Sequence, residues 1–132
     1  MDPSLPEQDQ IWLSGTQPAE GLSVVQVRGE LDMLTAPTLT EFLSRALASQ
    51  PRNLIIDITE VTFLGSSGLR ALVDSQHLAG EATQVALAVT PGSAALRSLE
   101  TSRLLELFMH FPTAGEALAA LADHSVKRDH PA

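Results

Sequence analysis

The stretch that decides the fold is Asn53-Leu-Ile-Ile-Asp-Ile-Thr-Glu-Val-Thr-Phe-Leu-Gly-Ser-Ser-Gly-Leu-Arg-Ala-Leu72. Its first part, Leu54–Ile58, is short and apolar on both faces, which is typical of a strand in the middle of a sheet. After a short turn, the apolar patch Val61–Leu64 leads into Gly65-Ser-Ser-Gly68. Apolar residues then recur at helical spacing. The stretch therefore predicts a buried strand followed by a helix, with a pair of serines where the helix begins.

The position of the two serines has an electrostatic consequence. The first four N–H groups of a helix lack intrahelical partners and carry the positive end of the helix dipole. A phosphate group on Ser66 would be well accommodated there. An ordinary N-cap serine, which stabilises a helix by about 1 kcal/mol, explains the same spacing. From the local pattern alone, both interpretations of Ser66 stay open.

The rest of the chain predicts alternating strands and helices, which indicates an α/β fold with a parallel or mixed sheet. Thr35 is the expected N-cap of the first helix, and residues 17–21 and 30–35 are expected to be a turn and a loop. The expected strands are 11–13, at an edge, 22–27, 54–58, 85–89 and 107–111, and the expected helices are 36–49, 66–80, 91–99 and 113–121.

Length and composition limit what the protein can be. A chain of 132 residues fits one domain, which we expect at 11–123, between a flexible arm at 1–10 and a polar tail at 124–132. Sixteen acidic residues against eight basic ones give a net charge of −8, which disfavours direct binding to nucleic acid. No signal peptide, membrane span or cysteine is present, so we expect a cytoplasmic protein without disulfides.

Several kinds of catalytic or metal site fit the sequence poorly. Gly65-Ser-Ser-Gly68 lacks the Gly-x-Ser-x-Gly spacing of a nucleophile elbow, and the pairs Asp74–His77 and Glu106–His110 have nothing that aims them at Ser66. No phosphate-binding Gly-Lys-Ser/Thr loop occurs, and the four histidines lack metal-ligand spacing. Asp57 interrupts a buried strand, where a carboxylate that accepts backbone N–H bonds is the simplest explanation. The sequence thus predicts no catalytic residue, metal or cofactor.

Three segments together resemble the STAS domain, in its anti-sigma factor antagonist branch. The first is Val27-Arg-Gly-Glu-Leu-Asp32 followed by Thr35-Ala-Pro37, and the second is Leu54–Leu69. The third and weaker segment is Leu104–Phe108 together with Phe111–Leu118. The resemblance spans about residues 10–122. It implies a single domain with a mixed sheet of four to five strands, with about four helices packed on one side of it.

The resemblance also implies a function. Members of this branch bind an anti-sigma factor that is also a serine kinase, and so release a sigma factor for transcription. The kinase phosphorylates the first serine of an Asp-Ser-Ser/Thr-Gly-Leu motif, the phosphorylated form lets go, and a phosphatase reverses the switch. Ser66 matches that serine, with Ser67 as the alternative acceptor. Asp32 matches an acidic residue near the phosphorylation site, whereas Gly65 stands where aspartate is usual.

The expected partner surface combines this motif, and the exposed side of the helix that follows it, with the loop before the first helix. It comprises Asp32, Met33, Leu34, Thr35, Gly65, Ser66, Ser67, Gly68 and Leu69. Met33 and Leu34 are apolar residues in a loop, for which local packing under the loop is the competing explanation. The sequence favours a monomer or weak dimer and leaves two other functions open. These are a STAS subunit of a membrane transport or lipid-trafficking complex, and a small serine-dependent enzyme.

Overall fold

The computed structural model describes the backbone of residues 11–129 and the side chains of residues 11–122. The arm predicted at 1–10 lies outside the described residues. No described helix has the length and hydrophobicity of a transmembrane segment. The elements are β1 (Ile11–Ala19), β2 (Leu22–Leu31), α1 (Ala36–Ala48), β3 (Asn53–Leu64), α2 (Ser66–Ala79), β4 (Gln84–Ala88), α3 (Ala94–Thr101), the 3₁₀ helix η2 (Leu104–Leu107), β5 (Met109–Phe111) and α4 (Ala114–Asp129).

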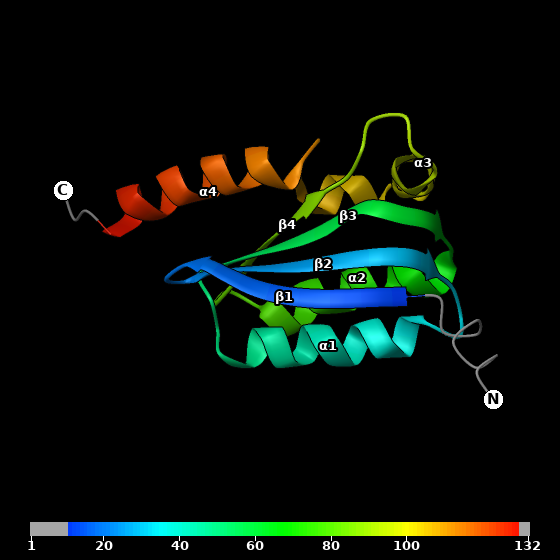
Figure 1. The fold of residues 1–132 in the computed structure, drawn as a ribbon, viewed down its shortest axis with the longest axis horizontal. Helices are drawn as coiled ribbons and strands as arrows, with labels where there is room; N and C mark the ends of the chain where they lie inside the picture. The colour runs from blue at the N-terminus through cyan, green and yellow to red at the C-terminus, as the bar shows by residue number, and fades with distance from the viewer. Residues whose placement is uncertain (1–10, 130–132) are drawn as a thin grey trace.

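The five strands form one mixed sheet in the order β1-β2-β3-β4-β5, which confirms the predicted fold class (Figure 1). β1 pairs with β2 in the antiparallel direction, and β2 to β5 run parallel to one another. The carboxyl ends of parallel strands lie at the same edge of a sheet. The end of β2 and the end of β3 are therefore neighbours, with Leu31 opposite Leu64, and Ser66 follows at this edge.

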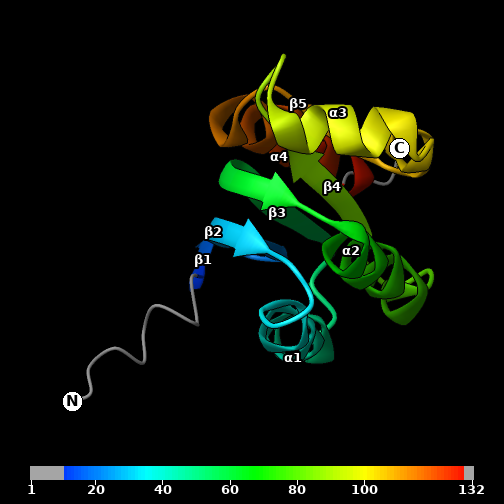
Figure 2. The ribbon, with the colours of Figure 1, turned by 90° about the vertical axis from the view of Figure 1, so that its right-hand side faces the viewer.

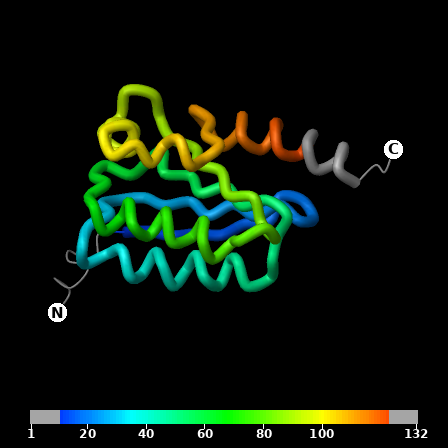
Figure 3. The backbone as a smooth tube through the Cα atoms, turned by 180° about the vertical axis from the view of Figure 1, so that it is seen from behind, coloured from blue at the N-terminus to red at the C-terminus, as the bar shows by residue number. Residues whose placement is uncertain are grey.

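Helices cover both faces of the sheet. α1 and α2 lie side by side on one face, over the larger core, which includes Val25, Ile56 and Leu87 (Figures 1 and 3). α4 lies on the opposite face, where Ala117 and Leu121 pack in a second core, and α3 packs near the end of β3 (Figure 2). The expectation that all helices lie on one side is wrong. The central strands are apolar on both faces, so both faces need a cover.

The sequence misplaced several strand ends. β1 continues through residues 17–19, where a turn was expected, and β2 includes Glu30 and Leu31, which were expected in a loop. Both extensions exist because the residues pair with a neighbouring strand, a contact that local propensity does not show. η2 was not expected and shortens β5 to three residues. α4 continues through residues 124–129, where the sequence suggested a polar tail.

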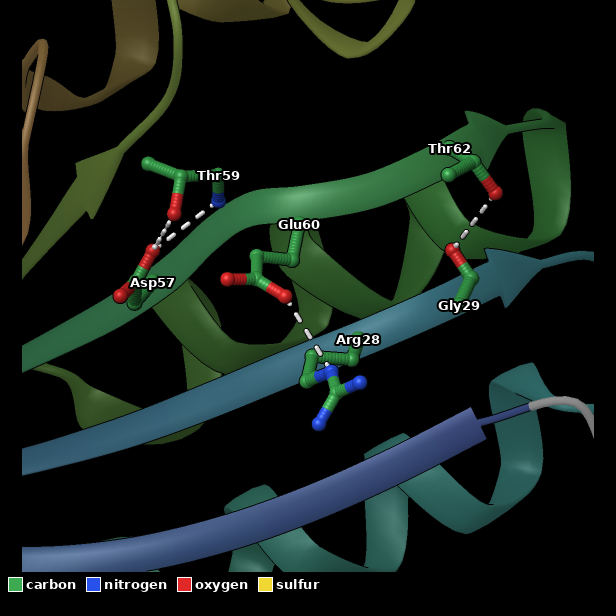
Figure 4. A network of polar contacts seen from close by, with 6 residues as sticks. All are labelled: Arg28, Gly29, Asp57, Thr59, Glu60 and Thr62. Carbon is green, nitrogen blue, oxygen red and sulfur yellow. Dashed lines mark hydrogen bonds and ion pairs between the residues drawn. The ribbon is translucent and has the colours of Figure 1, made fainter.

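The two apolar patches expected on either side of a short turn form one continuous strand, β3. At Asp57 and Glu60 the pairing with β2 shifts in register, so the strand bulges instead of turning. The Asp57 carboxylate accepts hydrogen bonds from the Thr59 backbone N–H (2.9 Å) and hydroxyl (2.7 Å), as Figure 4 shows. The expected role of Asp57 as an acceptor from the backbone is therefore confirmed for one N–H group, although Asp57 lies within β3 and not at a strand end. β4 ends opposite Asp57, and only β2 accompanies β3 from there to Leu64.

The backbone at Gly29, in the Gly29-Glu-Leu-Asp32 segment, has a conformation that favours glycine. Gly29 has φ of +114°, which side-chain-bearing residues rarely adopt. It lies at a second register shift between β2 and β3, and its carbonyl accepts a hydrogen bond from the Thr62 hydroxyl (Figure 4). Gly29 therefore bends β2 just before the loop that leads to α1.

Gly68 allows α2 to approach the end of β2 closely. A Cβ atom at this position would lie 2.7 Å from the Leu31 Cβ and 2.8 Å from the Leu64 Cδ1. Both neighbours are fully buried, so neither can move aside freely. The missing side chain is therefore a steric condition for placing the start of α2 on the sheet.

We predict that Gly68→Ala destabilises the fold by a net ~1–2 kcal/mol, because overpacking costs more than the helix gains from alanine. Urea unfolding measures the change. Gly115→Ala is the matched control: it also lies in a helix, and its Cβ would meet only the Thr113 hydroxyl, at 3.9 Å. That variant should be neutral or slightly stabilised. Equal stability of the two variants would contradict the steric role of Gly68.

Candidate functional site

The start of α2 presents the serine pair differently from the expected capped helix. Gly65, in extended conformation, is the N-cap, and no side chain caps the helix. Ser66 is the first helical residue and is exposed, while Ser67 is half-buried. The interpretation of Ser66 as an ordinary N-cap is wrong, because the cap falls one residue earlier. Among the described residues its hydroxyl has no hydrogen-bond partner, so the fold leaves it available for modification.

Leu31 fixes the position of this helix start. The Gly65 backbone N–H donates a hydrogen bond of 2.9 Å to the Leu31 carbonyl, and Gly68 packs over the Leu31 side chain. The first N–H bonded within the helix is that of Leu69, to the Gly65 carbonyl. The N–H groups of residues 66–68 precede it and have no helical acceptor. The site thus offers free donors and the positive end of the dipole beside an exposed hydroxyl.

The loop of residues 32–35 lies directly beside this helix start, because it follows Leu31. The Asp32 carboxylate accepts hydrogen bonds from the backbone N–H groups of Leu34 (2.9 Å) and Thr35 (3.1 Å). The buried Thr35 hydroxyl donates to the Glu30 carbonyl (2.6 Å) and accepts from the Asp32 N–H (3.0 Å). Thr35 is the N-cap residue, as expected, but its hydroxyl ties the loop together instead of capping α1.

These backbone donors change the acidity of Asp32. The hydrogen bond from the Thr35 N–H is the largest cause that lowers the pKa of Asp32 below its ordinary value of 3.8, and the Leu34 N–H adds to it. Donors directed at the carboxylate favour its charged form. Asp32 therefore acts first as an organiser of the loop, a role that the resemblance alone did not indicate.

Three large apolar side chains are exposed around Ser66. Met33 is 78% exposed, Leu34 69% and Phe63, at the end of β3, 50%. The competing explanation for Met33 and Leu34, local packing under the loop, is wrong. Exposed apolar residues that form a contiguous patch mark interaction sites.

Two shallow grooves flank the helix start. One, of about 370 Å³, lies between α1 and α2 and is lined by Met33, Ser67 and Arg70, among others. The other, of about 560 Å³, lies between the start of α2 and α3 and is lined by Phe63, Leu69 and others. We define the Ser66 surface as Met33, Leu34, Phe63, Ser66, Ser67, Leu69 and Arg70. The expected partner residues come from two segments, the loop after β2 and the start of α2, which meet at Leu31.

Sequence reasoning missed Phe63 and Arg70. Phe63 alternates with the buried Leu64 at the end of a strand, so the period of two indicated that one of them faces water. Arg70 follows Ser66 by four residues, which places the two on the same face of α2. Both signals were present, but they depend on knowing where β3 ends and α2 begins.

The acidic and histidine pairs considered as catalytic partners of Ser66 lie elsewhere in the fold. Asp74 lies eight residues further along α2, or ~12 Å at the rise of a helix, and His77 lies further still. Glu106, in η2, forms an ion pair with Arg103 (3.7 Å). In the part of the chain that the structure describes, no cluster of three acidic, histidine or cysteine residues is arranged to hold a metal.

Comparison with known proteins identifies the family. The STAS domain sequence profile matches residues 15–117. The chain belongs to the STAS domain family. Over 108 residues this STAS domain is 32% identical to the anti-sigma-F factor antagonist RsfB of Mycobacterium tuberculosis, an alignment that covers 82% of the chain and 88% of RsfB. The resemblance stated from the three segments is thereby confirmed.

Solved structures agree with this assignment. An anti-sigma factor antagonist from Mycobacterium paratuberculosis superposes with a TM-score of 0.78 and 36% identity, covering 85% of this chain and 94% of that one. The unphosphorylated form of SpoIIAA gives a TM-score of 0.68 at 18% identity, covering 85% and 97%, and shares the fold. This STAS domain therefore lies in the anti-sigma factor antagonist branch.

We predict that Asp32→Ala lowers stability only above the acid range. The folded pKa of Asp32 is below the unfolded one, so its contribution is complete above about pH 3.8 and is lost as the pH falls through the lowered value. Urea unfolding of wild type and variant across pH measures this, and the two curves should converge in acid. Asp32→Asn keeps an acceptor oxygen, so its free energy of unfolding should fall less than that of Asp32→Ala. A constant difference between wild type and Asp32→Ala at every pH would contradict this role.

Proposed function

We propose that this protein is an anti-sigma factor antagonist that binds an anti-sigma factor kinase through the Ser66 surface. Binding releases a sigma factor, and phosphorylation of Ser66 ends it. The protein acts by contact and is not an enzyme. The anti-sigma factor kinase is the direct binding partner, and a phosphatase removes the phosphate from Ser66. The names of its relatives in the two mycobacteria support the antagonist role.

The observation that carries this proposal is an exposed, unbonded hydroxyl surrounded by exposed apolar side chains. A kinase has to reach the hydroxyl of its substrate, and Ser66 is exposed at a helix start. A stable protein partner has to bury apolar surface, and Met33, Leu34 and Phe63 supply it. One surface can therefore serve both the binding of the kinase and the reaction that ends it.

The charge of a phosphate explains the switch. It adds roughly −1.5 to −2 at neutral pH, and the free N–H groups of α2 tolerate it without a change of fold. The partner, however, would have to desolvate a dianion in the middle of an apolar contact, which costs several kcal/mol without a basic group. Because 1.4 kcal/mol is already tenfold in affinity, this cost is enough to separate the two proteins.

Arg70 strengthens this switch. It is exposed, lines the groove beside Ser67 and lies four residues after Ser66, the better orientation for an acidic group that precedes a basic one. A phosphate on Ser66 would draw the guanidinium toward itself. Any contact that Arg70 makes with an acidic group of the partner would then be lost together with the neutral contacts of Ser66.

Gly65 departs from the aspartate that is usual before the serine. In this chain the Phe63 ring occupies the space beside it, because a Cβ atom at position 65 would lie 2.9 Å from the ring carbon Cε2. An apolar ring therefore replaces a carboxylate next to Ser66. We expect the kinase that recognises this site to present an apolar group there, in place of a basic one.

We predict that Ser66→Asp weakens kinase binding by about tenfold, whereas Ser66→Ala binds like wild type and is not released by ATP. Neither variant should change thermal stability much, because Ser66 is exposed and caps nothing. Calorimetric titration against the kinase measures binding. Intact mass after kinase and ATP treatment should show one added phosphate on wild type and on Ser67→Ala, and none on Ser66→Ala.

Equal affinity of wild type and Ser66→Asp, with wild type left unmodified, would refute the phosphorylation switch. Recovery of a membrane transport complex in place of a kinase from the source cell would then support the transport function.

The double substitution of Met33 and Leu34 by Ser should lower kinase affinity by about 10- to 100-fold, because two apolar side chains would no longer be buried in the complex. Leu78→Ser is the matched control, since Leu78 is 58% exposed near the other end of α2. It should bind like wild type in the same titration. Undiminished affinity of the double variant would exclude the loop from the interface.

A further inference from the structure

β1 is an unusually open sheet edge. Within the described residues it has a neighbouring strand on one side only, and its nine residues include no charged side chain. Proteins normally protect an edge strand with charge, with proline or by keeping it short. The other edge of this sheet follows that rule through its length, because β5 has only three residues, whereas β1 has one proline, Pro18, near its end. In a chain with a net charge of −8, an uncharged edge of this length favours addition of another strand.

An apolar groove runs beside this edge on the face covered by α1. It has a volume of about 380 Å³ and is lined by Gly15 and Gln17 of β1, by Val25 of β2 and by Phe42 and Ala46 of α1, among others. Gly15 has no side chain to fill it, and a Cβ atom there would lie 3.5 Å from the Phe42 ring. A strand added to β1 could place its own apolar side chains in this space.

We propose that β1 pairs with β1 of a second copy of this chain, antiparallel about a two-fold axis at Ser14. Pro18 lacks an N–H and limits pairing to the run Ile11–Gln17, whose centre is Ser14. Directly opposite residues share a face, so Leu13 of one copy lies opposite Gly15 of the other, and Ile11 lies opposite Gln17. Both apolar side chains pack, partly buried, against the core of their own copy, and their exposed parts then lie beside the groove of the other copy.

The outer face of this junction is also compatible with a second copy. Trp12, 59% exposed, lies opposite Thr16 of the other copy. Its ring is 5.6 Å from the Arg28 guanidinium, which in turn pairs with Glu60 at 3.2 Å, so the indole is already held in place. The acidic residues of each copy lie outside the paired strands. Their long-range repulsion makes the dimer weak at low salt and tighter as salt is added.

The dimer goes beyond the proposed function and leaves it intact. The groove lies beside Gly15–Gln17, whereas Ser66 follows the end of β3, at the edge of the sheet where β1 begins, since Ile11 pairs with Gly29. Because β2 lies between β1 and β3, which precedes Ser66, pairing along the free edge of β1 leaves both Ser66 surfaces uncovered. A dimer therefore presents two kinase-binding surfaces at once.

Sedimentation velocity over a concentration series tests the proposal. Wild type should show a reversible monomer–dimer equilibrium, and Ser14→Lys should raise its Kd about fivefold or more, because two lysines would lie directly opposite each other. Thr62→Lys makes the same change of charge on an exposed part of β3 and should leave the Kd nearly unchanged. A wild type that stays monomeric throughout, or equal effects of the two lysines, would overturn the proposal.

Cysteine cross-linking tests the register, since the chain has no cysteine of its own. Opposite residues in an antiparallel pair have Cα atoms about 4.5–5.5 Å apart, within disulfide range. Ser14→Cys should form a disulfide dimer rapidly under mild oxidation, whereas Gln17→Cys should not, because its counterpart is Ile11. Equal rates for the two variants would refute this register. Kinase binding by Ser14→Lys, unchanged from wild type, separates this test from that of the Ser66 switch.

Discussion

The packing of the start of α2 against Leu31 is the contact on which the rest of the site depends. One hydrogen bond, from the Gly65 N–H to the Leu31 carbonyl, and one steric gap, at Gly68, place the helix start at the end of β2. Because the loop of residues 32–35 leaves from the same Leu31, the serine pair and the exposed apolar side chains come from two distant segments and meet at one edge. A shift of the start of α2 relative to Leu31 would move the helix dipole, the Ser66 hydroxyl and the groove beside Arg70 together.

The site separates support from contact. The polar groups of Asp32 and Thr35 form hydrogen bonds within the loop. Gly65 and Gly68 lack side chains where the helix start packs closely against its neighbours. Most of the side chains of this surface that face water are apolar. Ser66 and Arg70 are polar, and neither has a hydrogen-bond or ion-pair partner among the described residues. Such a surface gives a protein partner apolar area to bury.

The open edge of β1 is a constraint of a different kind. A sheet with helices on both faces still has two edges. Among the described residues one edge is protected by the short β5, and the other only by Pro18 near the end of β1. At the second edge, β1 has no side chain at Gly15, which leaves an apolar groove open beside the strand. An interface there would lie away from Ser66, so assembly and partner release would respond to different variables, the first to concentration and salt and the second to phosphate.

The sequence by itself determined the order of strands and helices, the buried strand before Ser66 and the helix after it, because these follow from apolar periodicity and from glycine. It also determined the family, through Gly29–Asp32 and Gly65–Leu69. Only the tertiary structure decided that β3 is continuous through Asp57, that the cap is Gly65 and that α4 covers the second face, since each rests on pairing or packing between distant residues. Exposure was likewise a tertiary matter. Whether Met33, Leu34 and Phe63 face water depends on what the folded chain leaves uncovered around them.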